Sequence, residues 1–321
     1  MFALVLDVFK YCFASYCVVR LLKFLFILAK SIMVYFLTPE YNIDNLKDSW
    51  TVITGGTDGI GRAYIEELAR TRKISKFYLI GRNQAKLEKT SSELKRDYNA
   101  EVKYHIFDFE HDDYSKLPQE LENDVDVGIL INCAGIAPTQ VGNLVELEKG
   151  LASKILRVNL MSTVKMIELV LPGMLKRNKG CVVNVSSITG WRPLPYISSY
   201  PASKAALSFF SDALSDEFRS SNVRIQCLIP MLVATKVASY ETEEANDIFV
   251  VTPENFARQA VRIIGTRWEI TTGCIQHDIQ VAFGTLVSFW VFKVLFVPLV
   301  MLGIHKERVA AYQKKNSQKQ K

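Results

Sequence analysis

A glycine-rich segment, with an apolar run before it and a helical pattern after it, constrains this chain most strongly. The segment reads Thr54-Gly55-Gly56-Thr57-Asp58-Gly59-Ile60-Gly61 and follows the apolar run 50–53. Glycines allow a tight turn that brings backbone N–H groups close to a phosphate, and the following helix adds partial positive charge. The segment therefore predicts a strand–turn–helix unit that binds the pyrophosphate of a dinucleotide. A tight turn with incidental glycines is the alternative.

Short apolar runs alternate with helical patterns along the middle of the chain. The further runs are 77–80, 102–107, 128–131, 181–185 and 224–229. Continuous apolar runs predict strands covered on both faces, and their alternation with helices predicts parallel crossover connections. We therefore expect an α/β fold with a doubly wound (Rossmann) parallel sheet.

Three polar residues carry a second signal. Tyr200 and Lys204 stand four apart at the start of a helical pattern, so their side chains share one helix face. An ammonium group beside a phenol stabilises the phenolate, and we expect the pKa of Tyr200 to be lowered for this reason. Ser187 follows the run 181–185, and the carboxyl ends of parallel strands are where such sheets bind ligands. Because Tyr-x-x-x-Lys alone is common by chance, the weight of this signal comes from the three residues together.

The motifs occur in the order and spacing of a known family. Thr54-Gly55-x-x-x-Gly59-x-Gly61, Asn132-Cys133-Ala134-Gly135, Asn159, Ser187 and Tyr200-x-x-x-Lys204 resemble the motifs of the short-chain dehydrogenase/reductase family. The resemblance covers residues 48–275 and implies one catalytic domain there. The apolar ends and the motif Pro230-x-x-Val233-Ala234-Thr235-Lys236 are similar to its membrane-bound branch of 17β-hydroxysteroid dehydrogenases and very-long-chain 3-oxoacyl-CoA reductases.

The resemblance implies a role for each matching residue. Tyr200 would protonate the carbonyl oxygen, and Ser187 would bind and polarise the substrate carbonyl. Lys204 would lower the pKa of Tyr200 and bind the nicotinamide ribose, while Asn159 would position a water that relays protons to Lys204. Asp108 would contact the adenine. The full set implied in cofactor binding is Gly55, Thr57, Asp58, Gly59, Ile60, Gly61, Arg82, Asp108, Asn132, Ala134, Gly135, Tyr200, Lys204, Pro230 and Val233.

The residues after the second expected strand bear on the choice of nicotinamide cofactor. A domain that selects NAD places an acidic residue here to bind both ribose hydroxyls. This chain reads Ile80-Gly81-Arg82-Asn83, and no Asp or Glu follows within that turn. Arg82 offers a planar cationic fork that suits a 2′-phosphate, whereas an ordinary solvated arginine is the alternative. We therefore expect NADP(H) and a mainly reductive direction.

Three residues depart from the family pattern. Cys133 stands where a second asparagine is usual, and Met231 follows Pro230 where many members have glycine. We expect the first to affect packing beneath the cofactor and the second to affect backbone contacts to the nicotinamide carboxamide. Pro201 directly follows Tyr200, and because proline is tolerated only in the first helical turn, it predicts where that helix begins.

The N-terminal segment, residues 1–40, is apolar but interrupted by charges. Arg20, Lys23 and Lys30 fall on one stripe of a helix, apart from most of the large apolar residues. This pattern predicts a retained membrane anchor, as an interfacial helix or a transmembrane one.

The C-terminal apolar segment, residues 279–304, holds one charge, Lys293. A single span would place the basic tail, residues 305–321, across the bilayer from a cytosolic catalytic domain, against the positive-inside rule. We therefore expect a re-entrant or monotopic membrane segment, and an apolar helix buried at a subunit interface is the alternative.

Charge is concentrated near the end of the chain. The net charge is +6, and the tail contributes Lys306, Arg308, Lys314, Lys315, Lys319 and Lys321. A basic tail beside an apolar segment predicts contact with anionic lipid, or a solvated disordered tail, and not a nucleic-acid partner.

The acidic residues Glu241, Glu243, Glu244 and Asp247 predict a solvated loop that could close over a pocket. The six cysteines and four histidines form no ligand cluster, so we assign no metal.

These observations predict an NADPH-dependent oxidoreductase that reduces the ketone of an apolar lipid. The first expectation is a steroid dehydrogenase of steroid biosynthesis, and the alternative is a very-long-chain 3-oxoacyl-CoA reductase of fatty acid elongation. Rivals from other classes are a catalytically silent cofactor-binding scaffold and a soluble oligomer that buries its apolar ends between subunits. The family branch implies the endoplasmic reticulum membrane, with the catalytic domain facing the cytosol, and a homodimer is one possible state.

Overall fold

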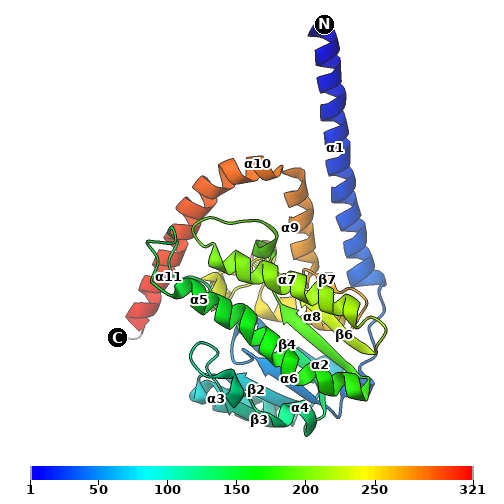
Figure 1. Cartoon of the computed structure of the whole chain (residues 1–321), viewed down its shortest axis with the longest axis vertical. Coiled ribbons are helices and arrows are strands. Elements are labelled where there is room, and N and C mark those ends of the chain that lie inside the picture. The colour runs from blue at the N-terminus through cyan, green and yellow to red at the C-terminus, as the bar shows by residue number, and fades with distance from the viewer. Residues whose placement is uncertain (1, 320–321) are drawn as a thin grey trace.

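A parallel sheet lies between two layers of helices in the computed structural model, which describes residues 2–319 (Figure 1). The seven strands lie in the order β3-β2-β1-β4-β5-β6-β7, and every neighbouring pair in this sheet is parallel. The predicted doubly wound α/β sheet is therefore confirmed. The strands are β1 (Trp50–Thr54), β2 (Lys76–Gly81), β3 (Glu101–Ile106), β4 (Val127–Asn132), β5 (Gly180–Val185), β6 (Val223–Leu228) and β7 (Ile270–Thr271).

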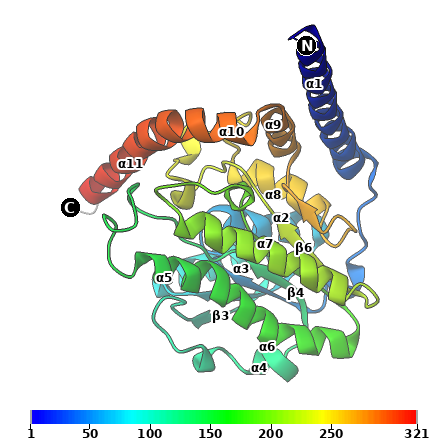
Figure 2. The same cartoon turned by 45° about the horizontal axis from the view of Figure 1, so that its top comes forward.

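Helices cover both faces of the sheet (Figure 2). Neighbouring residues of β1 show this arrangement, since Ile53 packs in one buried cluster and Val52 in the other. Both side chains are fully buried, which explains why a central strand such as β1 is apolar on both faces. The outer strand β3 is mostly exposed and includes Lys103, so the apolar run predicted there is mixed. The helices on the Ile53 face are α2 (Gly59–Arg72), α3 (Gln84–Tyr98) and α8 (Pro253–Arg262), and those on the other face are α4 (Glu120–Asn123), α6 (Ser162–Arg177) and α7 (Ser199–Glu217).

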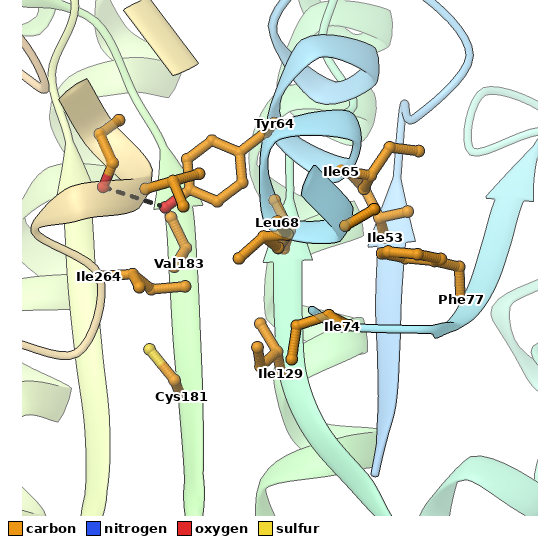
Figure 3. Close-up of a cluster of buried hydrophobic side chains, with 14 of the residues drawn as sticks. Ile53, Tyr64, Ile65, Leu68, Ile74, Phe77, Ile129, Cys181, Val183 and Ile264 are labelled. Atoms are coloured by element: carbon orange, nitrogen blue, oxygen red, sulfur yellow. Dashed lines mark hydrogen bonds between the residues drawn. The ribbon is translucent and has the colours of Figure 1, made fainter. Parts of the chain in front are cut away.

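The packing of α2 fixes the start of that helix at the end of β1. Figure 3 shows Tyr64, Ile65 and Leu68 of α2 among buried side chains of the sheet. The hydroxyl of Tyr64 donates a hydrogen bond to the carbonyl oxygen of Ala260 in α8, at 3.5 Å. A buried tyrosine that keeps a hydrogen-bond partner locks one helix against the next.

One stretch of the described residues, Leu151–Arg177, is long and apolar enough to cross a membrane by length and composition alone. It comprises α5 (Leu151–Leu156), a π-helical turn (Arg157–Met161) and α6. Because 56% of its most apolar window is buried inside the domain, this stretch is a core helix.

The N-terminal helix α1 (Phe2–Ile32) projects away from the domain and lies beside α9 (Ile275–Leu286) at its lower end (Figures 1 and 2). Arg20 donates a hydrogen bond to the carbonyl oxygen of Thr285 at 2.9 Å, and the ammonium of Lys30 lies 5.7 Å from the ring centre of Trp268. Two of the three cations on the predicted polar stripe therefore bind protein groups. How α1 meets a membrane stays a prediction.

The C-terminal apolar segment is bent. After α9 the backbone becomes extended at Val287, and the chain continues through α10 (Phe289–Val291), a π-helical stretch (Phe292–His305) and α11 (Lys306–Lys319). In Figure 1 these helices form an arch from the top of α9 down to the C-terminus. One straight helix across a membrane is thus not formed, and how the arch meets a membrane stays a prediction.

The basic tail is helical over its described part and contacts the acidic loop. Arg308 pairs with Glu244 at 3.0 Å and lies 3.9 Å from the ring centre of Tyr240, while Lys315 pairs with Glu241 at 3.7 Å. Opposite charges far apart in the sequence therefore meet, and the described part of the tail is a helix, which corrects the alternative of a disordered tail. Glu243 and Glu244 stay exposed, as expected of a solvated loop, and contact of the tail with anionic lipid stays a prediction. Lys321 lies outside the described residues.

Candidate active site

The predicted site residues gather at the carboxyl ends of the strands. In the observed strand order, β1 and β4 lie at the centre, where the succession of strands changes direction and where doubly wound folds bind ligands. The glycine turn follows β1, Arg82 follows β2, Asp108 follows β3, Asn132–Gly135 end β4 and continue beyond it, Ser187 follows β5, and Pro230 and Val233 follow β6.

The glycine turn brings the N-terminus of α2 to this edge. Gly59 has a φ of 51°, which favours glycine, and a Cβ atom added at Gly61 would lie 2.3 Å from the carbonyl oxygen of Gly55. The turn therefore leaves room only for backbone, so that N–H groups and the positive end of α2 can approach a phosphate. This geometry fits the pyrophosphate of a dinucleotide.

A side chain at the end of β1 is hydrogen-bonded to the segment that follows β4. The hydroxyl of Thr54 accepts hydrogen bonds from the backbone N–H groups of Ala134 at 3.1 Å and Cys133 at 3.2 Å. Sequence reasoning used Thr54 only as part of the motif and missed this link. A hydroxyl at the last residue of a strand was the available signal.

Asp58 holds two lysines in addition to capping α2. Its carboxylate accepts from the N–H of Gly59 at 3.0 Å, from the ammonium of Lys86 at 3.0 Å, and from Lys236. Partial burial opposes ionisation of Asp58, but hydrogen bonds from Lys236 and Lys86 together lower its pKa. Lys86 was missed in the sequence, although it stands in the first turn of the helix that follows Arg82.

Arg82 stands at the end of β2 as predicted. Its side chain is 61% exposed, and the guanidinium lies 3.5 Å from the carboxylate of Glu110, which also pairs with Lys154 at 2.7 Å. An exposed guanidinium with a shared partner can turn to a phosphate ligand at little cost. The position suits a 2′-phosphate on the adenosine ribose.

We expect Arg82→Ala to weaken NADPH binding about 10- to 100-fold, because one charge-assisted phosphate contact is lost. NADH, which lacks the 2′-phosphate, should bind with unchanged affinity. Titration of both cofactors by protein fluorescence measures the two dissociation constants. Arg96→Ala, which removes an exposed arginine paired with Asp97 on α3, is the control. Equal loss for both cofactors would contradict a phosphate role.

Among residues 2–319, ligand atoms of Asp108, Glu110 and His111 gather within 4.8 Å of one another. Glu110 already pairs with Lys154 and Arg82, and Asp108 accepts a hydrogen bond from His111 at 3.0 Å. Because protein cations and donors already satisfy these carboxylates, we assign no metal to the group.

Tyr200 lies in the first turn of α7, which starts at Ser199, so Pro201 marks the helix start as predicted. The hydroxyl of Tyr200 is hydrogen-bonded to the side chain of Ser187. Thr189 donates to the Ser187 oxygen from its hydroxyl, at 2.9 Å, and from its backbone N–H, at 3.2 Å. The two donors from Thr189 leave the hydroxyl hydrogen of Ser187 free to point at Tyr200 or at a bound carbonyl group.

The pKa of Tyr200 beside Lys204 differs from the prediction. Burial raises the pKa of Tyr200, and the hydrogen bond from Ser187 offsets this only in part. The ammonium of Lys204 lies 5.9 Å from the Tyr200 ring centre and donates to the carbonyl oxygen of Val185 at 2.9 Å. The expectation of a lowered Tyr200 pKa was therefore wrong for this structure, because removal of the phenolate from water outweighs the hydrogen bond from Ser187.

Burial also lowers the pKa of Lys204, to about 8. Between pH about 8 and about 10.5, the folded protein releases this proton while the unfolded chain keeps it, so stability rises with pH in that window. We expect Lys204→Met to raise the free energy of unfolding at pH 7 by up to about 3 kcal/mol. The gain should shrink as the pH approaches 10. Urea denaturation of both proteins across this range measures it, and a pH-independent difference would contradict the account.

Asn159 is fully buried in the π-helical turn between α5 and α6. Its amide exchanges hydrogen bonds with the backbone of Ile136, at 2.8 and 2.9 Å, and donates to the hydroxyl of Ser203 at 3.2 Å. A Cβ atom added at Gly135 would lie 3.6 Å from both the Asn159 Oδ1 and the Lys204 Nζ. The structure thus brings Asn159 close to Lys204, and π-helical turns of this kind are frequent at functional sites.

Comparison with known proteins decides the family. Residues 49–246 match the model of the short chain dehydrogenase family. The chain belongs to the short-chain dehydrogenase family. It is therefore an oxidoreductase of that family, and the resemblance predicted from its motifs is confirmed.

Three curated relatives extend the match. The chain is 61% identical over 183 residues to the uncharacterized oxidoreductase dhs-27 of Caenorhabditis elegans, a match that covers 57% of this chain and 22% of that longer protein. It is 34% identical over 271 residues to the very-long-chain 3-oxoacyl-CoA reductase of Mus musculus, covering 83% of this chain and 82% of the mouse protein. It is also 34% identical to hydroxysteroid dehydrogenase-like protein 1 of Gallus gallus, covering 79% of this chain and 77% of that protein.

A solved structure shows the same fold. A short-chain dehydrogenase from Sphingobium yanoikuyae, in complex with NADPH, superimposes with a TM-score of 0.63 at 25% identity. The superposition covers 70% of this chain and 87% of the Sphingobium protein.

Proposed function

We propose that this protein reduces the ketone of an apolar lipid to an alcohol, with NADPH as the reductant. The observation that carries the proposal is the group of Ser187, Tyr200 and Lys204 beside the glycine turn, at the carboxyl ends of the central strands. Family membership and the NADPH-bound structure of a relative support it.

In this proposal, NADPH when bound supplies a hydride to the carbonyl carbon. Ser187 would hold the carbonyl oxygen, and the hydroxyl proton of Tyr200 would pass to that oxygen as the C=O double bond becomes a single bond. Lys204 would return a proton toward Tyr200 and bind the nicotinamide ribose. Asn159 would connect this group to water through its position beside Lys204.

The residues present fit this cofactor. The backbone-only turn at Gly61 suits the pyrophosphate, and the exposed guanidinium of Arg82 suits the 2′-phosphate. Asp58 keeps the ammonium groups of Lys86 and Lys236 at the same edge, where they add positive charge. We therefore propose NADP(H) over NAD(H) as the cofactor pair.

An apolar wall beside the site supports a lipid substrate. Ile197, whose carbonyl accepts the backbone N–H of Tyr200 at 3.0 Å, packs in a buried cluster with Leu194 and Val141. Met301 and Val309 of the C-terminal arch complete the cluster. The arch therefore packs against the loops that precede Tyr200 and follow β4, which brings apolar side chains close to the proposed site.

Turnover of two ketones tests the proposal. Detergent-solubilised protein is mixed with NADPH and either a 17-ketosteroid or a long-chain 3-oxoacyl-CoA, and loss of NADPH absorbance is followed. Turnover of the steroid would support a steroid dehydrogenase, whereas turnover of the thioester would support the function named for the mouse relative. Measurable NADPH binding without turnover of either ketone would contradict the proposal and favour the scaffold interpretation.

We also propose that the protein is attached to the endoplasmic reticulum membrane with its catalytic domain in the cytosol. Large apolar side chains of α1 stay exposed, including Phe9 (67%) and Phe26 (69%), and so do Trp290 and Leu299 of the arch. Exposed apolar patches of this extent mark an interaction surface, and lipid is the partner that accepts apolar and basic residues together.

Extraction of cell membranes tests this attachment. The protein should stay in the membrane pellet after carbonate treatment and leave it only with detergent. Release by high salt alone would contradict the proposal and favour a soluble oligomer that buries its apolar ends. Light scattering of the detergent-solubilised protein tests the homodimer, which stays a prediction.

A further inference from the structure

The backbone of the loop after β6, residues 230–233, is hydrogen-bonded to a side chain that lies outside the family motif. The proposed function places the backbone of this loop, at Pro230 and Val233, against the nicotinamide. Met231 stands in this loop where many family members have glycine, so the contacts that hold its backbone are specific to this chain's own residues. The following inference rests on the proposed function.

His277, in the first turn of α9, contacts this loop through both ring nitrogens. Its Nδ1 accepts the backbone N–H of Met231 at 3.2 Å, and its Nε2 lies 3.3 Å from the carbonyl oxygen of Leu232. The side chain is fully buried. Because Nδ1 accepts, the ring proton must be on Nε2, and the neutral imidazole then matches one donor and one acceptor of two successive residues.

The backbone around Val233 is also held by hydrogen bonds to Val251. The N–H of Val251 donates to the carbonyl oxygen of Leu232 at 3.0 Å, and the N–H of Ala234 donates to that of Val251 at 2.9 Å. These two hydrogen bonds hold the peptide groups on both sides of Val233. The hydrogen bond to His277 holds the backbone N–H of Met231 in addition. We propose that His277 is a positioning residue, which holds the loop backbone in the orientation that binds the nicotinamide ring.

The helix turn that carries His277 is anchored independently of the loop. On this turn the carboxylate of Asp278 accepts the hydroxyl of Thr272 at 2.7 Å, and the hydroxyl of Tyr35 lies 3.1 Å from that of Thr271. These contacts tie the start of α9 to β7 and to the segment after α1. Asp278 therefore offers a control that disturbs the same turn without touching the loop.

Two ligands separate a positioning role from a merely structural one. NADPH carries the nicotinamide, whereas 2′,5′-ADP carries only the adenosine end and its phosphates. Loss of the His277 hydrogen bonds should loosen the loop and weaken the contacts to the nicotinamide alone. Titration calorimetry on the detergent-solubilised full chain gives both dissociation constants for wild type, His277→Ala, His277→Asn and Asp278→Asn.

We expect His277→Ala to raise the dissociation constant of NADPH about tenfold or more while that of 2′,5′-ADP stays within about twofold. His277→Asn, whose amide oxygen can accept the Met231 N–H, should recover part of the loss. Asp278→Asn should lower the melting temperature but leave the ratio of the two constants as in wild type.

Equal weakening of both ligands in His277→Ala would overturn the inference, and so would a ratio in His277→Asn that is no closer to the wild-type ratio than in His277→Ala. If His277→Ala does not fold, His277→Leu, which keeps a large side chain but accepts no hydrogen bond, takes its place. Failure of the wild-type protein to bind NADPH would instead overturn the proposed function, and with it this inference.

Discussion

Tyr200→Phe should lower the turnover of ketone by about 100- to 10,000-fold, which is the range for loss of a positioned acid. The phenol is the one group of the site that can deliver a proton to the carbonyl oxygen in the proposed reaction. Phenylalanine keeps the ring and its packing, so NADPH should bind with an affinity within about twofold of wild type. Stopped-flow loss of NADPH absorbance and a separate titration of NADPH measure the two quantities.

Tyr64→Phe is the matched control for this change. It removes the hydroxyl of a fully buried tyrosine, which bonds to the carbonyl oxygen of Ala260 in the core between α2 and α8. Its effect should fall on stability and leave turnover near the wild-type value. Unchanged turnover in Tyr200→Phe would remove Tyr200 from the chemistry and favour a scaffold.

Gly61→Ala should weaken NADPH binding by about 100-fold or more, since several backbone contacts to the pyrophosphate would be lost together. The added Cβ would lie 2.3 Å from the carbonyl oxygen of Gly55, a backbone atom that cannot move aside without reshaping the turn. Overpacking of this kind also costs about 1–3 kcal/mol of stability. Calorimetric titration and thermal unfolding give both effects.

Gly284→Ala provides the comparison for Gly61→Ala. A Cβ atom there would have no protein atom within 4 Å, and the residue lies inside α9. Alanine should therefore leave NADPH binding unchanged and stabilise the helix slightly. NADPH affinity near the wild-type value in Gly61→Ala would show that the glycine turn does not hold the cofactor.

The sheet could be predicted from the sequence because its central strands β1, β4 and β5 are buried along their whole length and are therefore largely apolar. The six expected runs start and end within one residue of β1 to β6. The strand β7 was missed because two residues, Ile270 and Thr271, are too short to show a pattern. Its place at the edge of the sheet depends on pairing with β6, which is a tertiary contact.

The residues of the candidate site could likewise be predicted from the sequence only in part. Residues that follow strands could be located, since the fold brings the carboxyl ends of parallel strands to one edge. Contacts between segments that are distant in the sequence could not be predicted. Examples are the contact of His277 with Met231, that of Lys86 with Asp58, and that of Arg308 with Glu244. The pKa of Tyr200 also escaped prediction, because burial depends on the whole domain and a spacing of four residues says nothing of it.

Transfer of deuterium from NADPH labelled at the reactive carbon of the nicotinamide tests the central claim most directly. Wild-type protein, the labelled cofactor and each of the two ketones are incubated, and the lipid product is analysed by mass spectrometry. The account predicts an alcohol that carries one deuterium atom from the cofactor, formed at least about 100-fold more slowly with Tyr200→Phe. Bound NADPH without deuterium in any lipid product, or equal labelling with Tyr200→Phe, would contradict it.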